Sequence, residues 1–324
     1  MKKKSALIMI SFCSIFFSFI YFSCNNNESS KATSKDSSAA KKGDSEHGKY
    51  LVSIAGCTDC HSHRQFEFFS GPVQQGTEGM GGQAFDHNLI GIPGVVYAKN
   101  ITSDTATGIG NWTDAEVIRA VTQGISRNGD SLFPLMPYTH FSQLAKQDLL
   151  DIVAYIRLLP PINNKVPERK LMFPISALYV PVTNNLEQNK KPSINDKTTY
   201  GKYLVGMASC ITCHTPVNEK GVPGESFTGG LTFHGPAFTV TSANLTSDSA
   251  TGLGTWTEER FLNKFKTYRE PSGYVFDPKE KNSYMPWAEF AKMNDEDLSA
   301  IFAFLKTLKP VNHLVEKYSM AKMK

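Results

Sequence analysis

The chain has 324 residues, of which 40% are hydrophobic and 20% are charged. A disordered chain has fewer apolar residues and a protein with many membrane spans has more, so the composition predicts two or three globular domains. The net charge is +4, but without Lys2, Lys3 and Lys4 only 31 basic residues face 30 acidic ones, a balance that argues against nucleic-acid binding.

The first 24 residues have the pattern of a bacterial lipoprotein signal peptide. Three lysines precede the apolar stretch 6–22, which is followed by Ser23-Cys24. The resemblance to a lipobox, with Tyr21 in place of the usual aliphatic residue, predicts that Cys24 is lipidated and becomes the new amino terminus. The alternative is an uncleaved anchor helix, because the apolar stretch is nearly long enough to span a bilayer. Both alternatives predict an exported protein that is tethered to a membrane.

Residues 25–46 are predicted to be a flexible tether. Up to position 42 they are rich in Asn, Ser, Lys and Ala and show no apolar periodicity, as in solvated linkers. We therefore expect the first folded domain to begin at residue 47.

The remainder of the chain contains two copies of one pattern. Gly48-Lys-Tyr-Leu-Val recurs at Gly201, and Cys57-Thr-Asp-Cys60-His61 recurs as Cys210-Ile-Thr-Cys213-His214, both after 153 residues. Segment 100–112 recurs after 144 residues, and Met136-Pro137 and Asp148-Leu149 recur after 149 residues as Met285-Pro286 and Asp297-Leu298. The same order with different loop lengths indicates a tandem duplication. We assign domain 1 to 47–162, a linker to 163–197 and domain 2 to 198–324.

Each copy is predicted to be mostly helical. A short helix through Tyr50, Leu51 and Ile54 leads to the first cysteine, and Tyr203 and Met207 have the same spacing before Cys210. A capping box of Thr113 and Glu116 opens a second helix that ends near Gly124, and Thr257 opens its counterpart. The last helices contain Leu149 and Leu298, and prolines at 160, 161 and 310 end them. The linker is rich in Pro, Asn and Lys, but its apolar runs at 171–174 and 177–180 predict that it packs on a domain surface as a strap.

The Cys-x-x-Cys-His motif is typical of c-type haem attachment. Its two thiols bond to the vinyl groups of the porphyrin, and the following imidazole becomes the proximal iron ligand. A thioredoxin-like site would need a βαβ context, and a zinc site would need four ligands around one metal, whereas here the cysteine pairs lie in separate copies. Structural disulfides are a further alternative in an exported chain. Of the six cysteines, four belong to the two motifs, Cys24 is the lipidation site and Cys13 lies in the signal peptide, so none is left for a disulfide.

The sixth iron ligand is predicted from the repeat. The candidates are Met80, His87, Met136 and His140 in domain 1, and Met207, His234, Met285 and Met293 in domain 2. Only Met136 and Met285 occupy matching positions, each followed by proline and each between the capped helix and the last helix. His140 aligns with Glu289. We therefore expect His/Met coordination in both domains, which favours reduced iron and raises the potential.

The Thr-Gly-x-Gly-x-Trp loops are candidates for contacts with the haem edge. Glycines allow a close approach of the backbone to a flat cofactor, and the indole N–H groups of Trp112 and Trp256 can donate to haem propionates. The alternative is a glycine turn beside a core tryptophan. Arg127 and Arg269 are weaker candidates for the propionates.

Together these motifs resemble class I cytochrome c domains, in particular the multihaem cytochrome c subunits of membrane-bound alcohol and gluconate dehydrogenases, over about residues 47–312. The resemblance implies an all-α chain of two tandem class I cytochrome c domains joined by a strapped linker. It implies two covalently bound haem c groups, one held by Cys57, Cys60, His61 and Met136 and one by Cys210, Cys213, His214 and Met285. Those subunits usually carry three haem domains, and this chain has motifs for two.

The expected function is that of a dihaem electron carrier, anchored through Cys24 in the bacterial periplasm. It would transfer single electrons from a dehydrogenase or a quinol-oxidising complex towards a terminal oxidase. The alternative is a dihaem enzyme, either a peroxidase or a thiosulfate-oxidising cytochrome. An enzyme would be expected to have unlike halves with one open iron, whereas both halves here offer the same pair of ligands.

Overall fold

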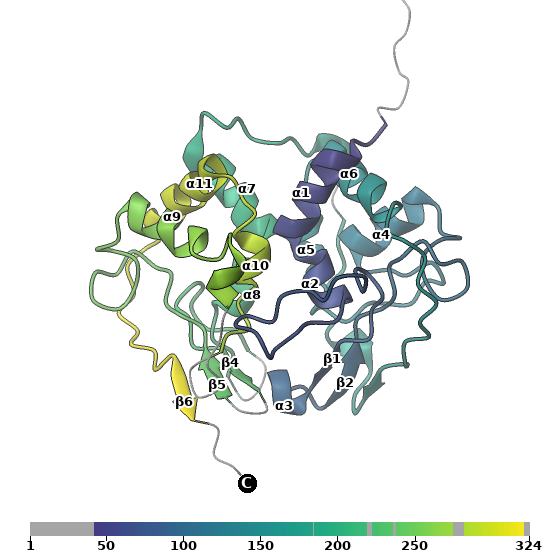
Figure 1. Cartoon of the computed structure of the whole chain (residues 1–324), viewed down its shortest axis with the longest axis horizontal. Helices are drawn as coiled ribbons and strands as arrows, with labels where there is room; N and C mark the ends of the chain where they lie inside the picture. Colours follow the sequence, from purple (N-terminus) through teal and green to yellow (C-terminus); the bar gives the residue numbers. More distant parts are fainter. Residues whose placement is uncertain (1–41, 184, 219–221, 236–237, 275–281, 321–324) are drawn as a thin grey trace, which may run out of the picture. The chain divides into compact units, whose positions relative to one another are not determined.

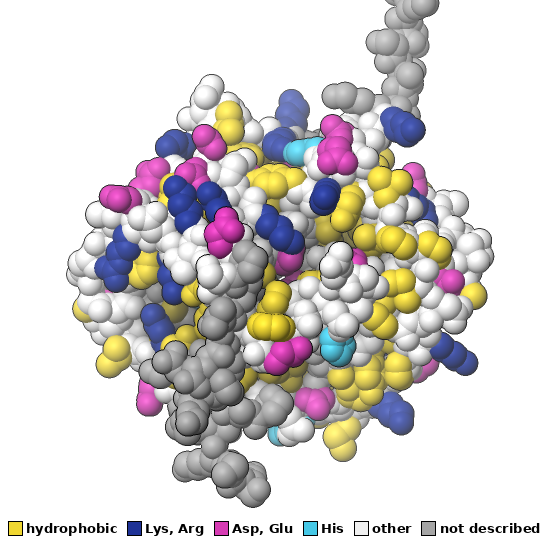
Figure 2. All heavy atoms as spheres, in the orientation of Figure 1, with side chains coloured by type: hydrophobic (Ala, Val, Ile, Leu, Met, Phe, Trp, Pro, Cys, Tyr) yellow, Lys and Arg dark blue, Asp and Glu magenta, His cyan; other side chains and the backbone are white. Residues whose placement is uncertain are grey.

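The computed structural model describes residues 42–183, 185–218, 222–235, 238–274 and 282–320 (Figure 1). The predicted signal peptide, Cys24 and most of the predicted tether lie outside the described residues. Within those ranges, no helix is both long enough and apolar enough to cross a membrane. On the face drawn in Figure 2, Lys and Arg side chains are interspersed with Asp and Glu.

The described helices follow the same order in the two halves of the chain. The first half contains α1 (Ser45–Ala55), α2 (Cys57–His61), α3 (His87–Ile90), α4 (Asp114–Gln123), α5 (Tyr138–Phe141) and α6 (Lys146–Ile156). The second half contains α7 (Lys197–Met207), α8 (Cys210–Cys213), α9 (Glu258–Lys266), α10 (Trp287–Phe290) and α11 (Asp295–Lys306). Short 3-10 turns lie at Ile175–Ala177, Leu186–Gln188 and Pro271–Tyr274. Apart from α3, each helix of the first half has a described counterpart in the second.

Two helix pairs form the centre of the halves, α1 with α6 and α7 with α11 (Figure 1). Each pair crosses at the glycine of the repeated Gly-Lys-Tyr-Leu-Val motif. A β-carbon on Gly48 would lie 1.8 Å from the carbonyl oxygen of Asp151, and one on Gly201 would lie 1.8 Å from that of Ala300. Only glycine permits this approach, so the repeated motif is explained by packing. Fully buried leucines surround both crossings, among them Leu51, Leu149, Leu204 and Leu298.

The helices predicted with caps and stops are confirmed. Thr113 and Glu116 form the expected capping box at the start of α4, and Gly124 ends that helix in the left-handed conformation, with φ of 66°. The Thr257 side chain caps α9 by accepting from the Arg260 N–H. The last helices, α6 and α11, end before the prolines at 160 and 310. These ends were predictable because they depend on local hydrogen bonds and backbone preferences.

The helix predicted to carry the first cysteine of each copy is interrupted. In the first half α1 ends at Ala55, Gly56 is left-handed with φ of 66°, and Cys57 begins a new helix. In the second half Ser209 occupies the equivalent position with φ of 51°. The helical spacing of the apolar residues continues across this break, which is why periodicity alone predicted one helix.

The all-α prediction is wrong in one respect, because each half also contains a small antiparallel sheet. The strands are β1 (Ala84–Asp86), β2 (Gly94–Tyr97) and β3 (Lys170–Leu171) in one sheet, and β4 (Thr232–His234), β5 (Phe238–Thr241) and β6 (Tyr318–Met320) in the other. The central strands contain Val95-Val96 and Thr239-Val240-Thr241, and β-branched residues favour strands. Strands of two to four residues are too short for their alternation to be recognised from sequence.

The predicted linker makes specific contacts with the first half. The Tyr179 hydroxyl donates to the Gln123 carbonyl at 3.0 Å, and the Val180 N–H donates to the Tyr138 hydroxyl at 3.0 Å. Further along, the Asn189 amide donates to the Ser142 carbonyl at 2.7 Å. In addition, β3 adds a strand to the first sheet.

A reciprocal pair of tyrosines makes one set of contacts between the two halves. The Tyr50 hydroxyl on α1 donates to Asp297 at 2.6 Å and accepts from the Asn294 N–H at 3.1 Å, both at the start of α11. The Tyr203 hydroxyl on α7 donates to Asp148 at 2.7 Å and accepts from the Ala145 N–H at 3.1 Å, both at the start of α6. Each half therefore supplies a tyrosine to the last helix of the other.

Candidate haem-binding sites

The two predicted proximal histidines have the same local geometry. The His61 Nδ1 lies 2.6 Å from the Lys99 carbonyl oxygen, and the His214 Nδ1 lies 2.7 Å from the Ala243 carbonyl oxygen. Because a carbonyl only accepts, Nδ1 carries the proton and the lone pair is on Nε2. Burial lowers the pKa of both imidazoles, which keeps them neutral. A neutral imidazole oriented through Nδ1, with Nε2 free to bind, is the form in which histidine ligates iron.

The four motif cysteines, Cys57, Cys60, Cys210 and Cys213, are free thiols. Burial raises the pKa of Cys57, Cys60 and Cys210 to about 12, so these thiols are protonated at neutral pH. A thioredoxin-like dithiol needs a lowered pKa, and a zinc site needs four ligands around one metal. Among the described residues, no cysteine belongs to a cluster of potential metal ligands. The structure thus supports neither of these alternatives, and the free thiols fit covalent attachment of haem.

The two Cys-x-x-Cys-His motifs lie close to each other. Besides burial, the Asp59 carboxylate raises the pKa of both Cys60 and Cys213, and the Arg64 guanidinium lowers the pKa of both. Asp59 and Arg64 form an ion pair at 3.1 Å, with side chains only 12% and 8% exposed. One charged pair from the first half therefore lies within electrostatic range of both motifs.

Met136 and Met285 lie in equivalent backbone environments. Each precedes a proline that starts a four-residue helix, and the two prolines have similar dihedral angles, with φ of −82° and −77°. The carbonyl oxygens of both methionines accept a backbone N–H two residues later at 2.8 Å. Both side chains are partly buried and pack against the hydrophobic core. The repeat therefore extends to the local conformation that would present each thioether.

The other candidate axial ligands have less suitable positions. Met207 is fully buried and Met293 is 2% exposed, both in the hydrophobic core of the second half. His140 lies on α5, one turn past Met136, and burial lowers its pKa. His87 and His234 are exposed, and Met80 is partly buried. Unlike Met136 and Met285, these residues have no counterparts of the same type in the repeat.

Trp112 and Trp256 also occupy equivalent positions. Both are partly buried against the core, and their backbone N–H groups bond to the carbonyls of Ile109 and Leu253 at 3.0 Å. Neither indole N–H has a hydrogen-bond partner in the part of the chain that the structure describes, which leaves both free for a propionate. The weaker candidates have other partners: Arg127 pairs with Glu116, and Arg269 pairs with Asp295.

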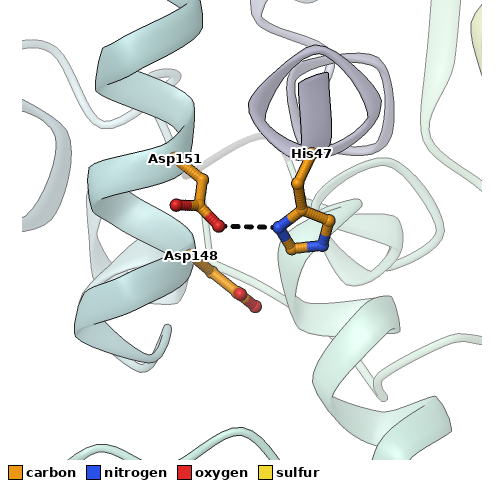
Figure 3. A group of neighbouring side chains, drawn as sticks. All are labelled: His47, Asp148 and Asp151. Atoms are coloured by element: carbon orange, nitrogen blue, oxygen red, sulfur yellow. Dashed lines mark hydrogen bonds and ion pairs between the residues drawn. The ribbon is translucent and has the colours of Figure 1, made fainter. Parts of the chain in front are cut away.

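A separate cluster of His47, Asp148 and Asp151 resembles a cation site (Figure 3). The His47 ring points at the Asp151 carboxylate, which also accepts from the Asp44 N–H at 2.8 Å and the Gln147 amide at 2.7 Å. The Asp148 carboxylate accepts from Tyr203 and pairs with Lys191 at 3.4 Å. These carboxylates already have hydrogen donors, so the cluster is explained by helix and linker contacts.

Comparison with protein families identifies the second half. Residues 198–309 match the family model described as cytochrome c. Residues 198–309 are a cytochrome c domain. The family model covers α7, the second Cys-x-x-Cys-His motif, Met285 and α11.

Comparison with individual proteins extends the similarity to most of the chain. The cytochrome c subunit of alcohol dehydrogenase (quinone) from Gluconacetobacter polyoxogenes is 27% identical over 282 residues, which cover 82% of this chain and 56% of that protein. The gluconate 2-dehydrogenase cytochrome c subunit of Pantoea cypripedii is 27% identical, with 81% and 59% covered. A diheme cytochrome c-type protein of Cereibacter sphaeroides is 26% identical, with 83% and 87% covered. The chain spans little more than half of the two dehydrogenase subunits. The predicted resemblance is confirmed, and a cytochrome c domain implies covalently bound haem c.

Sequence reasoning missed the residues that join the two sites. The sequence places Tyr50 and Tyr203 on the short helix before the first cysteine, but it does not indicate that their hydroxyls bind carboxylates in the other half. A signal was present, because the tyrosine and its aspartate partner both recur in the two copies. Asp59 and Arg64 carry no such signal, since the second copy has Thr212 and Val217 at the related positions.

Proposed function

We propose that the chain consists of two tandem class I cytochrome c domains and carries two haem c groups. Cys57, Cys60, His61 and Met136 would hold one haem, and Cys210, Cys213, His214 and Met285 the other. The observation that carries the proposal is the pair of imidazoles held through Nδ1 by carbonyls 2.6 and 2.7 Å away, directly after the cysteines. The family model covers only the second half, and the repeated geometry is the argument for the first.

The residues of the chain have three tasks in this function. Histidine and methionine would hold the iron on its two sides in each half, which would leave no site for a substrate at either iron. The hydrophobic core packed against Met136 and Met285 would exclude water, and the indole N–H groups of Trp112 and Trp256 would donate hydrogen bonds to propionates. A bound haem supplies a one-electron couple, whose potential the thioether raises. Filled axial positions in both halves favour an electron carrier over a peroxidase or a thiosulfate-oxidising enzyme.

We further propose that the protein receives electrons from a dehydrogenase or a quinol-oxidising complex and passes them towards a terminal oxidase. Two of the relatives named above are cytochrome c subunits of dehydrogenases, which supports the dehydrogenase as donor. The proposed location is the bacterial periplasm, with a membrane anchor at Cys24. The signal-peptide pattern of residues 1–24 supports the anchor, and mass spectrometry of the mature amino terminus would test it.

The ligand assignment is tested by magnetic circular dichroism of the oxidised, haem-loaded protein. Intact mass should show two haems, and the near-infrared spectrum should contain methionine–iron charge-transfer intensity for both. We expect Met136→Ala and Met285→Ala each to lose half of that intensity while retaining both haems. Met293→Ala serves as the control, because this buried methionine lies outside the proposed ligand set.

Other results would overturn the proposal. A single bound haem would contradict the assignment of two sites. A high-spin or bis-histidine haem in the unmodified protein would contradict the two equivalent sites and favour the enzyme, and turnover of peroxide and thiosulfate would then be measured.

A further inference from the structure

The two copies differ in length in two segments, and these segments contact each other. The spacing in residue number from the haem-motif histidine to the asparagine of the following Asn-x-Thr-Ser-Asp motif is 39 in the first half and 30 in the second. The spacing from the loop tryptophan to the predicted axial methionine is 24 in the first half and 29 in the second. Ser70 lies in the longer segment of the first half, and Asn282 lies in that of the second.

Ser70 is bonded directly to the backbone that carries Met285. Its hydroxyl donates to the Met285 carbonyl oxygen at 2.6 Å and accepts from the Trp287 N–H at 3.0 Å. Ser70 is completely buried. The hydroxyl thus binds the backbone on both sides of Pro286, between the predicted ligand and α10. In Figure 1 the loop that follows α2 extends across towards the second half.

Asn282 fixes the same contact from the second half. Its side-chain oxygen accepts from the Ser70 N–H at 2.8 Å and from the Ser283 N–H at 2.7 Å, and its amide donates to the Phe66 carbonyl at 2.9 Å. Asn282 is 1% exposed. The Ser283 hydroxyl in turn accepts from the Met285 N–H at 3.1 Å. Every hydrogen-bonding group of the Asn282 side chain is therefore used to join the two loops.

The Ser70 loop is also connected to the first haem motif. Arg64 pairs with Asp59, between Cys57 and Cys60, and its Nε donates to the Gly71 carbonyl at 2.8 Å. Arg64 also donates to the Ser70 carbonyl. The Phe66 ring packs on the Tyr284 ring, with centroids 4.9 Å apart. Hydrogen bonds thus run without interruption from the first Cys-x-x-Cys-His motif to the loop of Met285.

The first half has no equivalent of this support. The Met136 N–H donates to the Phe133 carbonyl at 3.0 Å, and its carbonyl accepts from the Tyr138 N–H at 2.8 Å. Within the described ranges, no residue of the second half is hydrogen-bonded to the backbone of Met136. Among the described residues, hydrogen bonds from the other half therefore support the backbone at Met285 and not the backbone at Met136.

We propose that Ser70, held by Asn282, is a positioning residue that keeps the Met285 thioether at the iron of the second haem. This inference rests on the proposed function, because it takes Met285 as the axial ligand. Loss of the Ser70 hydroxyl leaves two backbone groups of a buried loop with fewer partners, and the loop is then freer to move the thioether away. The effect is selective, because Met136 is held without help from the second half.

The test is made in a Met136→Ala background, in which the methionine–iron charge-transfer band reports only on Met285. Imidazole is titrated into the oxidised protein, and loss of the band measures how easily Met285 is displaced. We expect Ser70→Ala to lower the imidazole concentration at half-displacement about tenfold, equivalent to about 1.4 kcal/mol. We also expect it to lower the midpoint potential of the second haem. Asn282→Ala should change both quantities in the same direction.

Two further variants distinguish the effect of the Ser70 hydroxyl from the effect of its backbone conformation. Ser70 has a φ of 67°, so Ser70→Gly relieves the backbone and removes the hydroxyl. In this variant imidazole should displace Met285 as readily as in Ser70→Ala, and the variant replaces Ser70→Ala in the test if that protein does not fold. Thr77→Ala is the matched control, because its hydroxyl bonds only to Gln74 and His63 of the first half. It should leave the titration unchanged.

The outcomes separate this inference from the proposed function. If Met285→Ala keeps the charge-transfer band of the second haem, the ligand assignment itself is wrong. If Met285→Ala loses the band but both Ser70 variants need the same imidazole concentration for half-displacement as the Met136→Ala protein, Met285 is the ligand and the role of Ser70 is refuted. An equal shift in both haems, measured in the Met136-containing protein, would also refute it, because the proposed effect is confined to the second site.

Discussion

Two sets of contacts between the halves differ in how they are built, and the comparison between them is instructive. At the helix ends, Tyr50 and Tyr203 each bind an aspartate and a backbone N–H of the other half, with nearly identical distances. At the loops, Ser70 and Asn282 join segments that differ in length between the two copies. Repeated residues make the first contact twice, and segments of unequal length make the second only once.

This difference explains how two similar sites can acquire different properties. A contact made by repeated residues is the same in both halves, so it stabilises their association without making the two proposed haem sites different. The Ser70 contact acts on Met285 alone, and the Asp59–Arg64 pair of the same half acts on both motifs. The copies therefore differ in their loop contacts and in individual charged residues, while the helix crossings and the tyrosine contacts retain the symmetry of the duplication.

The largest effect on stability is expected at the two helix crossings, where equivalent substitutions test whether the halves are packed alike. We expect Gly48→Ala and Gly201→Ala each to destabilise the protein by about 3 kcal/mol or more, because the new β-carbon would lie 1.8 Å from a helix carbonyl oxygen. Urea unfolding of the haem-loaded protein, followed by far-ultraviolet circular dichroism, measures the loss.

Gly206 provides a control on the same helix as Gly201. A β-carbon there would meet no atom within 4 Å, so Gly206→Ala should stabilise α7 by about 0.5–1 kcal/mol. If Gly201→Ala were as well tolerated as Gly206→Ala, close approach would not explain the repeated motif.

The second prediction concerns the reciprocal tyrosines. We expect Tyr50→Phe and Tyr203→Phe each to cost about 1–3 kcal/mol, because a buried aspartate and a backbone N–H lose a partner. Asp297 is 2% exposed and Asp148 is 3% exposed. The measurement is again the free energy of unfolding.

Tyr155→Phe is the control for the tyrosine variants. The Tyr155 hydroxyl has no hydrogen-bond partner among the residues that the structure describes, so its removal should change stability by less than about 0.5 kcal/mol. A large difference between the Tyr50 and Tyr203 variants would show that the two contacts, despite their equal geometry, are energetically unequal.

The sequence allowed prediction of what depends on local or repeated signals. Thr113 and Gly124 marked the ends of α4, and the doubled Cys-x-x-Cys-His motif and the aligned Met136 and Met285 defined the candidate sites. The haem ligand set itself remains a prediction. The hydrogen bonds from His61 and His214 to carbonyls far along the chain were not predictable, because any backbone carbonyl is chemically equivalent in a sequence.

The contacts between the halves were beyond prediction for a physical reason. Ser70 and Asn282 are 212 residues apart and belong to segments without a repeat, so neither periodicity nor alignment relates them. The sheets were missed because their strands are short and two of them, β3 and β6, come from segments outside the core of each copy. Tertiary packing, not local propensity, determines such elements.

The third prediction concerns the contribution of Asp151 to the pH dependence of stability, which has no equivalent at the matching position of the second half. Burial raises the pKa of Asp151, but hydrogen bonds from His47, the Asp44 N–H and Gln147 outweigh it and lower the pKa below its usual 3.8. Below that usual value the unfolded chain binds more protons than the folded one, so stability falls as the pH falls. Ala300 occupies the equivalent position in the second half and cannot contribute.

We therefore expect Asp151→Asn to flatten the loss of stability below about pH 4, the usual range of an aspartate. His47→Gln should flatten it less, because the other two donors to Asp151 remain. The free energy of unfolding is measured with urea at a series of pH values from about 2.5 to about 6, which spans the range in which carboxyl groups titrate. An unchanged slope in Asp151→Asn would assign the acid sensitivity to other carboxylates.

The smallest expected effect compares two equivalent helix caps. Thr113 and Thr257 each accept a backbone N–H at 3.2 Å, from Glu116 and Arg260 respectively, and replacing a threonine cap by alanine typically costs about 1 kcal/mol. The Thr113 hydroxyl also donates to the Glu116 carboxylate at 3.1 Å, a contact that Arg260 cannot offer to Thr257. Thr113→Ala should therefore cost a few tenths of a kcal/mol more than Thr257→Ala, on the order of a solvent-exposed side-chain pair. A larger cost for Thr257→Ala would mean that the packing of α9, and not the cap, determines the stability of that turn.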